Sequence, residues 1–371
     1  MSDKIWVSPP HMTGEELDYI KEGLTGNLIA STGRNIDQFE KEIKFFLGEQ
    51  KEVCALNSGT SAIHLALIQL GVKANDNVIC QSFTFSASAN PILYLGARPI
   101  FIDSERDTWN LCPKLLEEAI VQSIKKGKKP KAIIAVHLYG MPYKVNEVNA
   151  ISKKYEVPII EDAAEALGST FNNQQCGTFG DFGILSFNGN KIITTSSGGA
   201  VLCNNGVTKN EIIHLATQAK DNAPHYQHSK IGYNYRMSNI LASIGLSQIK
   251  VLNDRIVSRR KNFEYYLEQL GGNSKIKFLK EQSGLFSNRW MTTILTNSFE
   301  DREKIRKALE KDNIESKPLW KPLHIQPIFS EYPSYCNGTA ENLFKKGLCL
   351  PSGSNLLKMD MDKIITIINN N

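Results

Sequence analysis

The stretch VPIIEDAAEALGSTFNNQQCGTFGDFGILSFNGNK, residues 157–191, decides the fold. It opens with an apolar run, Val157–Glu161, which is followed at once by Asp162. A second apolar run, Phe182–Phe187, leads into a short polar turn that ends at Lys191. Short apolar runs bounded by turn residues are typical of buried strands. The stretch therefore predicts two strands of one sheet, each followed closely by a charged side chain.

The same pattern extends outward to about residues 50 and 205, where apolar runs alternate with segments of helical length. Strands that alternate with helices indicate βαβ units and an α/β fold with a mostly parallel sheet. Ligands of such sheets bind beyond the carboxyl ends of the strands. The further predicted strands are Val53–Leu56, Asn77–Cys80, Pro99–Ile102 and Ala132–Val136, with Pro158–Glu161 in the stretch quoted above, and the predicted helices are Ser61–Leu70, Ser86–Leu95 and Lys144–Tyr155.

A smaller α/β domain is predicted in the C-terminal part. The segment Met237–Leu270 is helical in character, and a helix of that length often joins two domains. It is followed by a strand-like run, a charged helix and an apolar helix, which are Trp290–Leu295, Phe299–Asp312 and Met361–Ile368. We therefore expect a large domain over residues 1–245 and a small domain over residues 246–371, joined by the long helix.

Two helix starts are predicted ahead of the first strand. Thr13 and Glu16 have the spacing of a capping box, in which each side chain bonds to the other residue's amide. Asp37 and Glu40 have a variant of that spacing. We expect one helix to begin at each pair.

Composition excludes several classes of protein. With 41% hydrophobic and 22% charged residues in 371, the chain is an ordinary globular one. The net charge of +5 is scattered, and its one dense cluster, residues 125–131, is expected to be a solvated loop rather than a nucleic-acid site. No run is long and apolar enough for a membrane span, and Met1–His11 lacks a signal-peptide core. Seven widely spaced cysteines favour a reducing cytosol over disulfides or a metal site, so we expect a cytoplasmic protein.

Asp162 and Lys191 together predict a cofactor. Asp162 alone suits a helix N-cap, and most lysines are solvated surface charges. Lys191, however, ends a strand without an amphipathic helix and is surrounded by small residues. A lysine forms a Schiff base with the aldehyde of pyridoxal phosphate, while an aspartate keeps the pyridine nitrogen protonated. The pair therefore predicts a pyridoxal phosphate enzyme.

Other candidate segments also follow strands or open helices. Gly59, Thr60 and Ser61 open the helix after the first strand, where backbone N–H groups bind phosphate or are simply capped. Phe85 follows the second strand and is suited either to stacking on a planar ring or to core packing. Tyr235 and Arg236 lie just before Ser238, and the arginine suits a phosphate or carboxylate group. The alternative is a polar helix entry with Ser238 as the N-cap. His324 lies in a proline-bounded loop, as a binding residue or a packed histidine.

These segments resemble the DegT/StrS family of sugar aminotransferases, which have the fold-type I (aspartate-aminotransferase-like) architecture. The resemblance covers about residues 5–355. Its motifs are Thr32-Gly33, NSGTSA (57–62), QSFTF (81–85), VHLYG (136–140), EDAAEALGS (161–169), SFNGNK (186–191), GYNYRMSN (232–239), KPLH (321–324) and GLCLPSG (347–353).

The resemblance implies roles for individual residues. Lys191 is the Schiff-base lysine and later the acid/base, and Asp162 is the partner of the pyridine nitrogen. Glu165 meets the ring hydroxyl, although glutamine or histidine is commoner there. The other implied cofactor ligands are Gly59, Thr60 and Ser186 in the phosphate cradle, Phe85 on the ring, Asn234 as a phosphate ligand reaching over from the second subunit of a homodimer, and also Ser61 and Asn188. The implied substrate-binding residues are Asn190, Tyr235, Arg236, Arg289 and His324; no metal ligand is implied.

Within the family, SFNGNKIITTS, SNRWMTT (287–293) and LWKPLHIQP (319–327) resemble the branch that aminates a UDP-2-acetamido-4-keto-2,6-dideoxyhexose, as in bacillosamine biosynthesis. Lys317 departs from that branch, which usually has arginine there. The implied reaction transfers the amino group of L-glutamate to C4 of the keto sugar. The alternatives are a dTDP- or GDP-linked keto sugar, a non-catalytic sensor that binds pyridoxal phosphate, and a lyase or dehydratase on the same fold.

Overall fold

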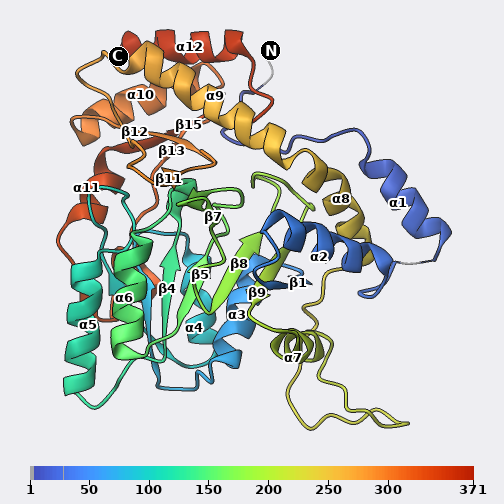
Figure 1. The fold of residues 1–371 in the computed structure, drawn as a ribbon. Coiled ribbons are helices and arrows are strands. Elements are labelled where there is room, and N and C mark those ends of the chain that lie inside the picture. Colours follow the sequence, from blue (N-terminus) through green and yellow to red (C-terminus); the bar gives the residue numbers. More distant parts are fainter. Residues whose placement is uncertain (1–3, 28) are drawn as a thin grey trace.

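The computed structural model describes residues 4–27 and 29–371, and its fold is built on one large and one small sheet (Figure 1). The large sheet has eight strands, of which β9 runs antiparallel to both neighbours while the other paired strands are parallel. The predicted α/β class with a mostly parallel sheet is confirmed. In order across the sheet, its strands are β1 (Glu52–Leu56), β9 (Gly199–Cys203), β8 (Phe182–Ser186), β5 (Ile159–Asp162), β4 (Ala132–Val136), β2 (Asn77–Gln81), β3 (Arg98–Ile102) and β14 (Ser334–Tyr335).

The strands quoted or listed from the sequence all form, with their ends displaced by two residues at most; the largest shifts are at the start of the quoted run Val157–Glu161 and of the C-terminal run Trp290–Leu295. Their side chains alternate between the two faces, as the pleat requires. In β4, Ile134 packs in the core on one face and Ile133 in the core on the other. A strand buried on both faces has no polar residue to mark its orientation, which is why the sequence shows continuous apolar runs.

Helices cover both faces of the large sheet (Figure 1). One core is closed by α3, α4 and α7, and the opposite face is covered by α2, α5, α6 and α8. The bounds of these helices are α2 (Arg34–Phe46), α3 (Gly59–Gln69), α4 (Asn90–Tyr94), α5 (Pro113–Lys125), α6 (Val145–Tyr155), α7 (Gly206–Ala216) and α8 (Asn239–Lys250).

Three helix predictions are corrected by the structure. The helix expected over Ser86–Leu95 is a 3-10 turn followed by the five-residue α4, because Pro91 cannot donate a helical hydrogen bond. The helix expected at Asp37 begins earlier, at Arg34. Its first amides are capped by the side-chain oxygen of Asn239, which accepts from Asn35 N at 3.1 Å, so no local capping residue marks the start.

The long helix expected over Met237–Leu270 is two helices, α8 and α9 (Leu252–Leu270). Val251 between them has φ −103° and ψ 8°, and its amide bonds to the carbonyl of Gln248 rather than to that of Ser247, one residue further back. The two helices pack on different parts of the molecule. α8 packs on α2 and on α1 (Glu16–Thr25), whereas α9 continues to the small sheet.

The small sheet is antiparallel and belongs to the C-terminal part. Its order is β10 (Lys277–Phe278), β12 (Thr292–Leu295), β15 (Gly347–Leu350) and β13 (Lys317–Pro318). Its helices are α10 (Phe299–Lys311), α11 (Thr339–Lys346) and α12 (Lys358–Asn369), which contain the charged and the apolar helix expected there. A third, three-stranded sheet joins β11 (Leu285–Phe286) to β6 (Thr170–Phe171) and β7 (Gln174–Gln175).

Two segments cross the expected domain boundary. Ile5 forms a bridge with Ile314 in the C-terminal part, and β14 adds a parallel strand to β3 of the large sheet. A shared apolar core that includes Trp290 and Tyr139 lies where the two parts meet. The division at residue 245 stays a prediction.

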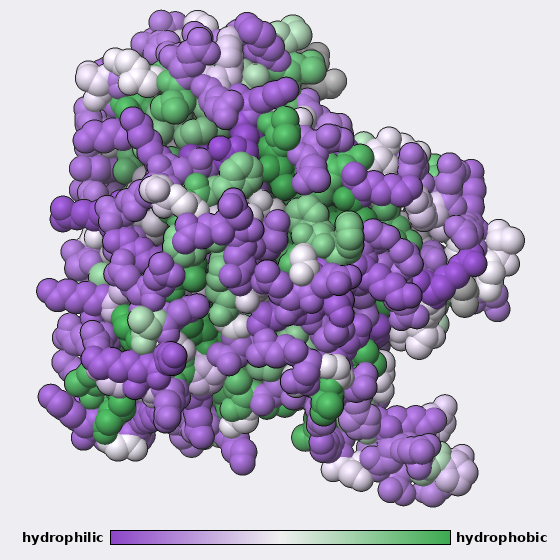
Figure 2. All heavy atoms as spheres, in the orientation of Figure 1, coloured by the Kyte–Doolittle hydropathy of each residue, from purple (hydrophilic) through white to green (hydrophobic). Residues whose placement is uncertain are grey.

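Within the described ranges, no helix has both the length and the apolar character needed to cross a membrane. The same residues contain no group of three or more histidine, cysteine or acidic side chains placed to hold a metal ion. The seven cysteines are free. Figure 2 shows one face of the molecule as mostly hydrophilic, with the segment between α7 and α8 standing out from the body as a lobe.

Candidate active site

A pocket of about 300 Å³ lies beyond the carboxyl ends of the central strands. Val136, Asp162 and Ser186 line it from the ends of β4, β5 and β8, as expected for a ligand site in a parallel sheet. The structure brings together in this pocket nine of the residues predicted from the sequence, which are Gly59, Thr60, Phe85, Asp162, Glu165, Ser186, Asn188, Asn190 and Lys191.

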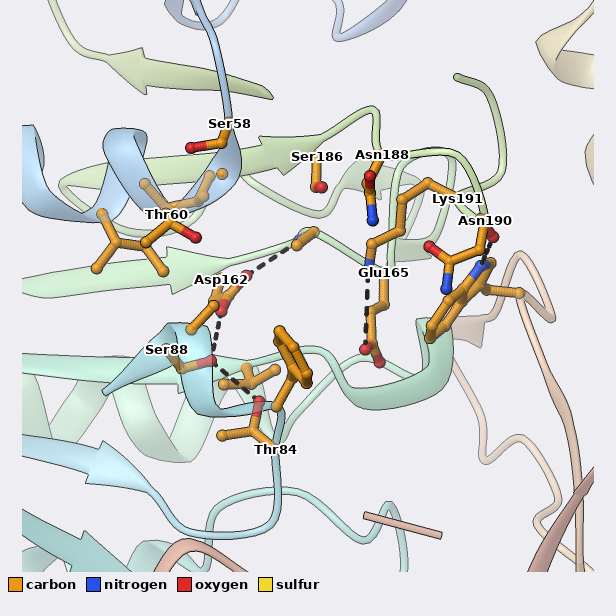
Figure 3. A pocket seen from close by; sticks show the side chains of 18 of the residues that line it. Ser58, Thr60, Thr84, Ser88, Asp162, Glu165, Ser186, Asn188, Asn190 and Lys191 are labelled. Carbon is orange, nitrogen blue, oxygen red and sulfur yellow. Dashed lines mark hydrogen bonds and ion pairs between the residues drawn. The ribbon is translucent and has the colours of Figure 1, made fainter. Parts of the chain in front are cut away.

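The start of α3 forms one end of the pocket (Figure 3). Ser58 is the N-cap, and its hydroxyl accepts from Ser61 N at 3.1 Å. The first amides of a helix have no acceptor within the helix, so they are available to an anion. Gly199 of β9 lets the strand pass close behind, since a Cβ on it would lie 2.4 Å from Gly59 N. The geometry fits a phosphate group at this end.

Asp162 lies at the floor of the pocket and is buried. Its carboxylate accepts from Ser88 Oγ at 2.7 Å and from Ala164 N at 3.2 Å. Ser88 is itself bonded to Thr84 Oγ1 at 3.0 Å (Figure 3). Asp162 does not cap a helix, because β5 is followed by a turn. Its carboxylate is thus held in place by a side chain from another loop and remains on the pocket wall.

Lys191 reaches across the pocket toward Glu165 (Figure 3). Its Nζ lies 3.8 Å from Glu165 Oε1 and 4.2 Å from the centroid of the Trp290 ring. The other oxygen of Glu165 accepts from Tyr139 N at 2.7 Å. Burial raises the pKa of Glu165, and the positive charge of Lys191 opposes that rise. Lys191 and Glu165 are therefore placed as an ion pair beside the pocket.

Three predicted residues are used elsewhere in the fold. The Arg236 guanidinium pairs with Glu40 and donates to Ala55 O at 2.9 Å, which supports β1 from behind. Arg289 donates to Leu279 O at 2.9 Å and lies over the ring of Phe263 at 3.6 Å. Burial lowers the pKa of Arg289 to about 10. The hydroxyl of Ser61 bonds to that of Ser58 at 2.7 Å. None of the three is among the pocket-lining residues.

Asn234, Tyr235 and His324 also lie outside this pocket. His324 is a packed loop histidine, with Nδ1 2.6 Å from Ser82 Oγ and Nε2 3.3 Å from Glu341 Oε1. Tyr235 stacks on Tyr233 with centroids 5.0 Å apart. Asn234 is exposed at the base of the lobe between α7 and α8. Ser238 caps α8, which was the alternative role of its segment.

Sequence reasoning missed three residues of the pocket. Trp290 and Trp320 line it, and Ser88 positions Asp162. Trp290 and Trp320 each occur in a quoted motif, beside Arg289 and before His324, and a tryptophan in such a segment is equally suited to core packing. Nothing in the local sequence marks Ser88, because its role comes from a contact with a distant strand end.

The sequence matches the DegT/DnrJ/EryC1/StrS aminotransferase family over residues 10–369. The chain belongs to this family. It is 48% identical to EpsN of Bacillus subtilis, provisionally named a pyridoxal phosphate-dependent aminotransferase, over 99% of this chain and 96% of the relative. It is 38% identical to the GDP-perosamine synthase of Escherichia coli O157:H7, over 98% and 97%.

A more distant relative acts on a UDP-linked sugar. It is the UDP-4-amino-4,6-dideoxy-N-acetyl-beta-L-altrosamine transaminase of Campylobacter jejuni, 30% identical over 94% of this chain and 92% of the relative. Among solved structures, a family member from Brucella abortus superposes with a TM-score of 0.90 at 30% identity, covering 96% of this chain and 95% of the other. The predicted fold-type I architecture, the aminotransferase class and the dependence on pyridoxal phosphate are confirmed.

The pocket fits this cofactor on three counts. The α3 amides suit its phosphate, Asp162 suits its pyridine nitrogen, and Lys191 suits its aldehyde. Gly59 packs so closely on β8 that a Cβ there would lie 3.4 Å from Leu185 O, so the helix start and Ser186 form one continuous wall. The residues present are the donor set that the cofactor needs.

Proposed function

We propose that this protein transfers an amino group from L-glutamate to C4 of a nucleotide-linked 4-keto-6-deoxy sugar. The observation that supports it most is the convergence of Lys191, Asp162 and the start of α3 on one pocket at the carboxyl edge of the sheet. When bound, pyridoxal phosphate supplies an aldehyde that carries the amino group and a ring that accepts electrons.

The chain's own residues would do the rest. The amides of Gly59 and Thr60, with Ser186, bind the phosphate, and Asn188 extends that wall. Asp162, held by Ser88, keeps the ring nitrogen protonated. Phe85 would stack on the ring, and Glu165 would hydrogen-bond its hydroxyl.

Lys191 moves the proton between the cofactor and the substrate carbon. Its Nζ is directed into the pocket and forms an ion pair with Glu165. A group within reach of the reacting carbon, with a carboxyl partner that is itself buried, is suited to repeated proton transfer. Asn190, at the pocket rim, is the neighbouring candidate for contact with the sugar.

The two candidate substrates differ in the nucleotide to which the sugar is linked. The motifs of this chain favour UDP-2-acetamido-2,6-dideoxy-hexos-4-ulose, and a UDP-sugar transaminase is among its relatives. A GDP-linked 4-keto sugar is the second candidate, because the GDP-perosamine synthase is the more similar of the two relatives, at 38% against 30% identity. Tyr235, Arg236, Arg289 and His324 were implied as substrate contacts; with their side chains outside the pocket, any contact by them would be at its periphery or in an assembly.

We propose a homodimer whose sites are completed by the partner. Asn234 is exposed, does not line the pocket of its own chain, and belongs to the segment between α7 and α8 that forms the projecting lobe (Figure 1). The lobe carries Tyr226 and Ile231 with 84% and 81% of their surface exposed. Exposed apolar side chains on a projecting segment fit a contact with a second copy. We also infer a reducing compartment such as the cytoplasm, given the seven free cysteines.

A substrate panel tests the proposal. The holoenzyme is incubated with L-glutamate and UDP-, dTDP- or GDP-linked 4-keto sugars, and the amino sugars are identified by mass spectrometry. We expect 2-oxoglutarate and an amino sugar with the UDP-linked substrate. Amination of only the GDP-linked sugar would select the second candidate. A bound cofactor that glutamate leaves unchanged would instead indicate a sensor, and loss of water without 2-oxoglutarate would indicate a dehydratase.

A further inference from the structure

Trp290 contacts the lysine segment at two points. Its ring lies under Lys191 Nζ at 4.2 Å, and its indole N–H donates to the carbonyl of Asn190 at 2.7 Å. Asn190 is the residue just before Lys191, so one side chain holds both the backbone and the tip of the lysine. Trp290 is itself 1% exposed and therefore has little freedom to move.

The surroundings of Trp290 fix it from behind. Its carbonyl accepts from Arg259 NH1 at 2.6 Å, and its ring lies parallel to that of Tyr139, with centroids 6.4 Å apart. Ser8 Oγ donates to the same Asn190 carbonyl at 2.8 Å. The lysine segment is thus held by the N-terminal segment and by the turn ahead of β12, which are far apart in sequence.

The same turn also holds the partner of Lys191. Trp290 N donates to Asn288 Oδ1 at 2.9 Å, and Asn288 Nδ2 donates to Glu165 O at 3.0 Å. The turn therefore bonds to the backbone on both sides of the pair, at Asn190 and at Glu165. A Cβ on Gly140 would lie 1.9 Å from Asn288 Oδ1, which shows how closely Asn288 is enclosed.

We propose that Trp290 is a positioning residue that holds the Lys191 amine, with Glu165, whenever the amine is not bonded to the cofactor. A transaminase lysine must be released for half of each cycle and must stay within reach of the substrate carbon. An aromatic face attracts a cation by about 1 kcal/mol or more when partly desolvated. Lys191 is 14% exposed at its side chain, so the ring and Glu165 are its main neighbours in the pocket. The inference rests on the proposed role of Lys191.

Amine labelling of the cofactor-free protein tests this without using turnover. The protein is treated at neutral pH with an acetylating reagent, and acetylation of Lys191 is followed by peptide mass spectrometry. In Trp290→Leu the amine loses its aromatic face, and we expect labelling to be about fivefold faster. Trp290→Phe keeps a ring and should restore most of the protection, whereas a merely structural role would not distinguish the two variants.

Two further variants make the test decisive. Trp6→Leu is the matched control, since Trp6 also has a lysine over its ring, Lys4 at 4.1 Å, but on the surface; labelling of Lys191 should not change. Glu165→Gln keeps the shape of the side chain and should also speed labelling, so the test survives if Trp290→Leu does not fold. Wild-type labelling rates in the folded Trp290 and Glu165 variants would overturn the inference.

Different results would contradict the inference and the proposed function. If Lys191→Ala retained turnover, the role of the lysine would be wrong, and the inference with it. If Lys191→Ala were inactive but labelling of Lys191 were unaffected by Trp290 and Glu165, only the positioning role would be lost.

Discussion

Asp162 is a single carboxylate whose position depends on two other parts of the chain. Ser88 and the amide of Ala164 each donate to one of its oxygens, which leaves the group fixed at the floor of the pocket. A fixed negative charge at this point favours a protonated ring nitrogen, and a neutral amide would not.

We therefore expect Asp162→Asn to bind pyridoxal phosphate but to lose at least about a hundredfold in turnover. Steady-state kinetics with the preferred sugar would measure this loss of turnover. Asp181→Asn is the control, because Asp181 precedes β8 at the opposite edge of the sheet, where it accepts from Ile159 N at 2.8 Å. Full activity in Asp162→Asn would contradict the assignment.

Glu165 gives the cofactor-free protein a pH dependence. Because burial raises its pKa in the folded state, the folded protein binds that proton more tightly than the unfolded chain. The resulting stability is fully present below the ordinary pKa of a glutamate and is lost as the pH rises through the raised value. Glu165→Gln should lack this loss. The melting temperature of the variant, relative to that of wild type, should therefore increase between acidic and neutral pH. Parallel melting curves at all pH values would argue against it.

The sequence indicated the two charged candidates of the pocket more readily than the residues that position them. Lys191 and Asp162 were found because each follows an apolar run with an unusual neighbourhood. Arg236 was equally suited to bind an anion. In the structure it instead pairs with Glu40, which belongs to the distant helix α2, and both side chains are buried. Contacts of that kind depend on the tertiary fold, and no spacing along the chain reveals them.

Among the elements, the buried strands were predicted well and the helix ends less well. A strand such as β4 is marked by its apolar run alone. The break at Val251 between α8 and α9 is not marked, since both halves favour a helix and the change of direction follows from their different packing partners. The capping box predicted for α1 forms only in part: Thr13 N donates to Glu16 Oε1 at 2.8 Å, but the Thr13 hydroxyl accepts from Glu15 N at 3.0 Å, and the helix begins at Glu16.

Glu16 docks α1 onto α8. Burial opposes its ionisation, but donors from Thr13, Gly14 and Gln248 outweigh that effect and lower its pKa to about 2. The stability it contributes is present above the ordinary pKa of a glutamate and is lost as the pH falls through the lowered value.

We expect Glu16→Gln to lower the free energy of unfolding by about 2 kcal/mol at neutral pH, and the difference to disappear in acid. Urea unfolding at several pH values would show it. Glu22→Gln on the same helix, whose ion pair with Arg34 is exposed, should change little. Equal stability of Glu16→Gln and wild type at neutral pH would contradict this role.

For the whole molecule, the prediction of an α/β protein with a smaller C-terminal domain needed only the order of the elements. The return of β14 to the large sheet was not predicted, because its two residues carry no strand pattern. Assembly depends on contacts between two chains, which no pattern in the sequence of one chain marks. We propose that the exposed lobe and Asn234, which does not line the pocket of its own chain, act in a dimer.

Subunit mixing tests that assembly. Lys191→Ala and Asn234→Ala should each be inactive alone, since each removes a part of every site. After the subunits are exchanged in equal amounts, half the dimers carry one intact site, so about one quarter of wild-type activity should return. Light scattering would confirm the dimer. Failure of exchanged subunits to regain any activity would place Asn234 outside the shared site.

The absorbance of the holoenzyme on addition of L-glutamate tests the central assignment most directly. Wild-type protein should show the visible band of lysine-bound pyridoxal phosphate, and glutamate should bleach it as 2-oxoglutarate forms. Lys191→Ala should lack that band and should have no measurable turnover with any keto sugar. Unchanged turnover in Lys191→Ala would contradict the account.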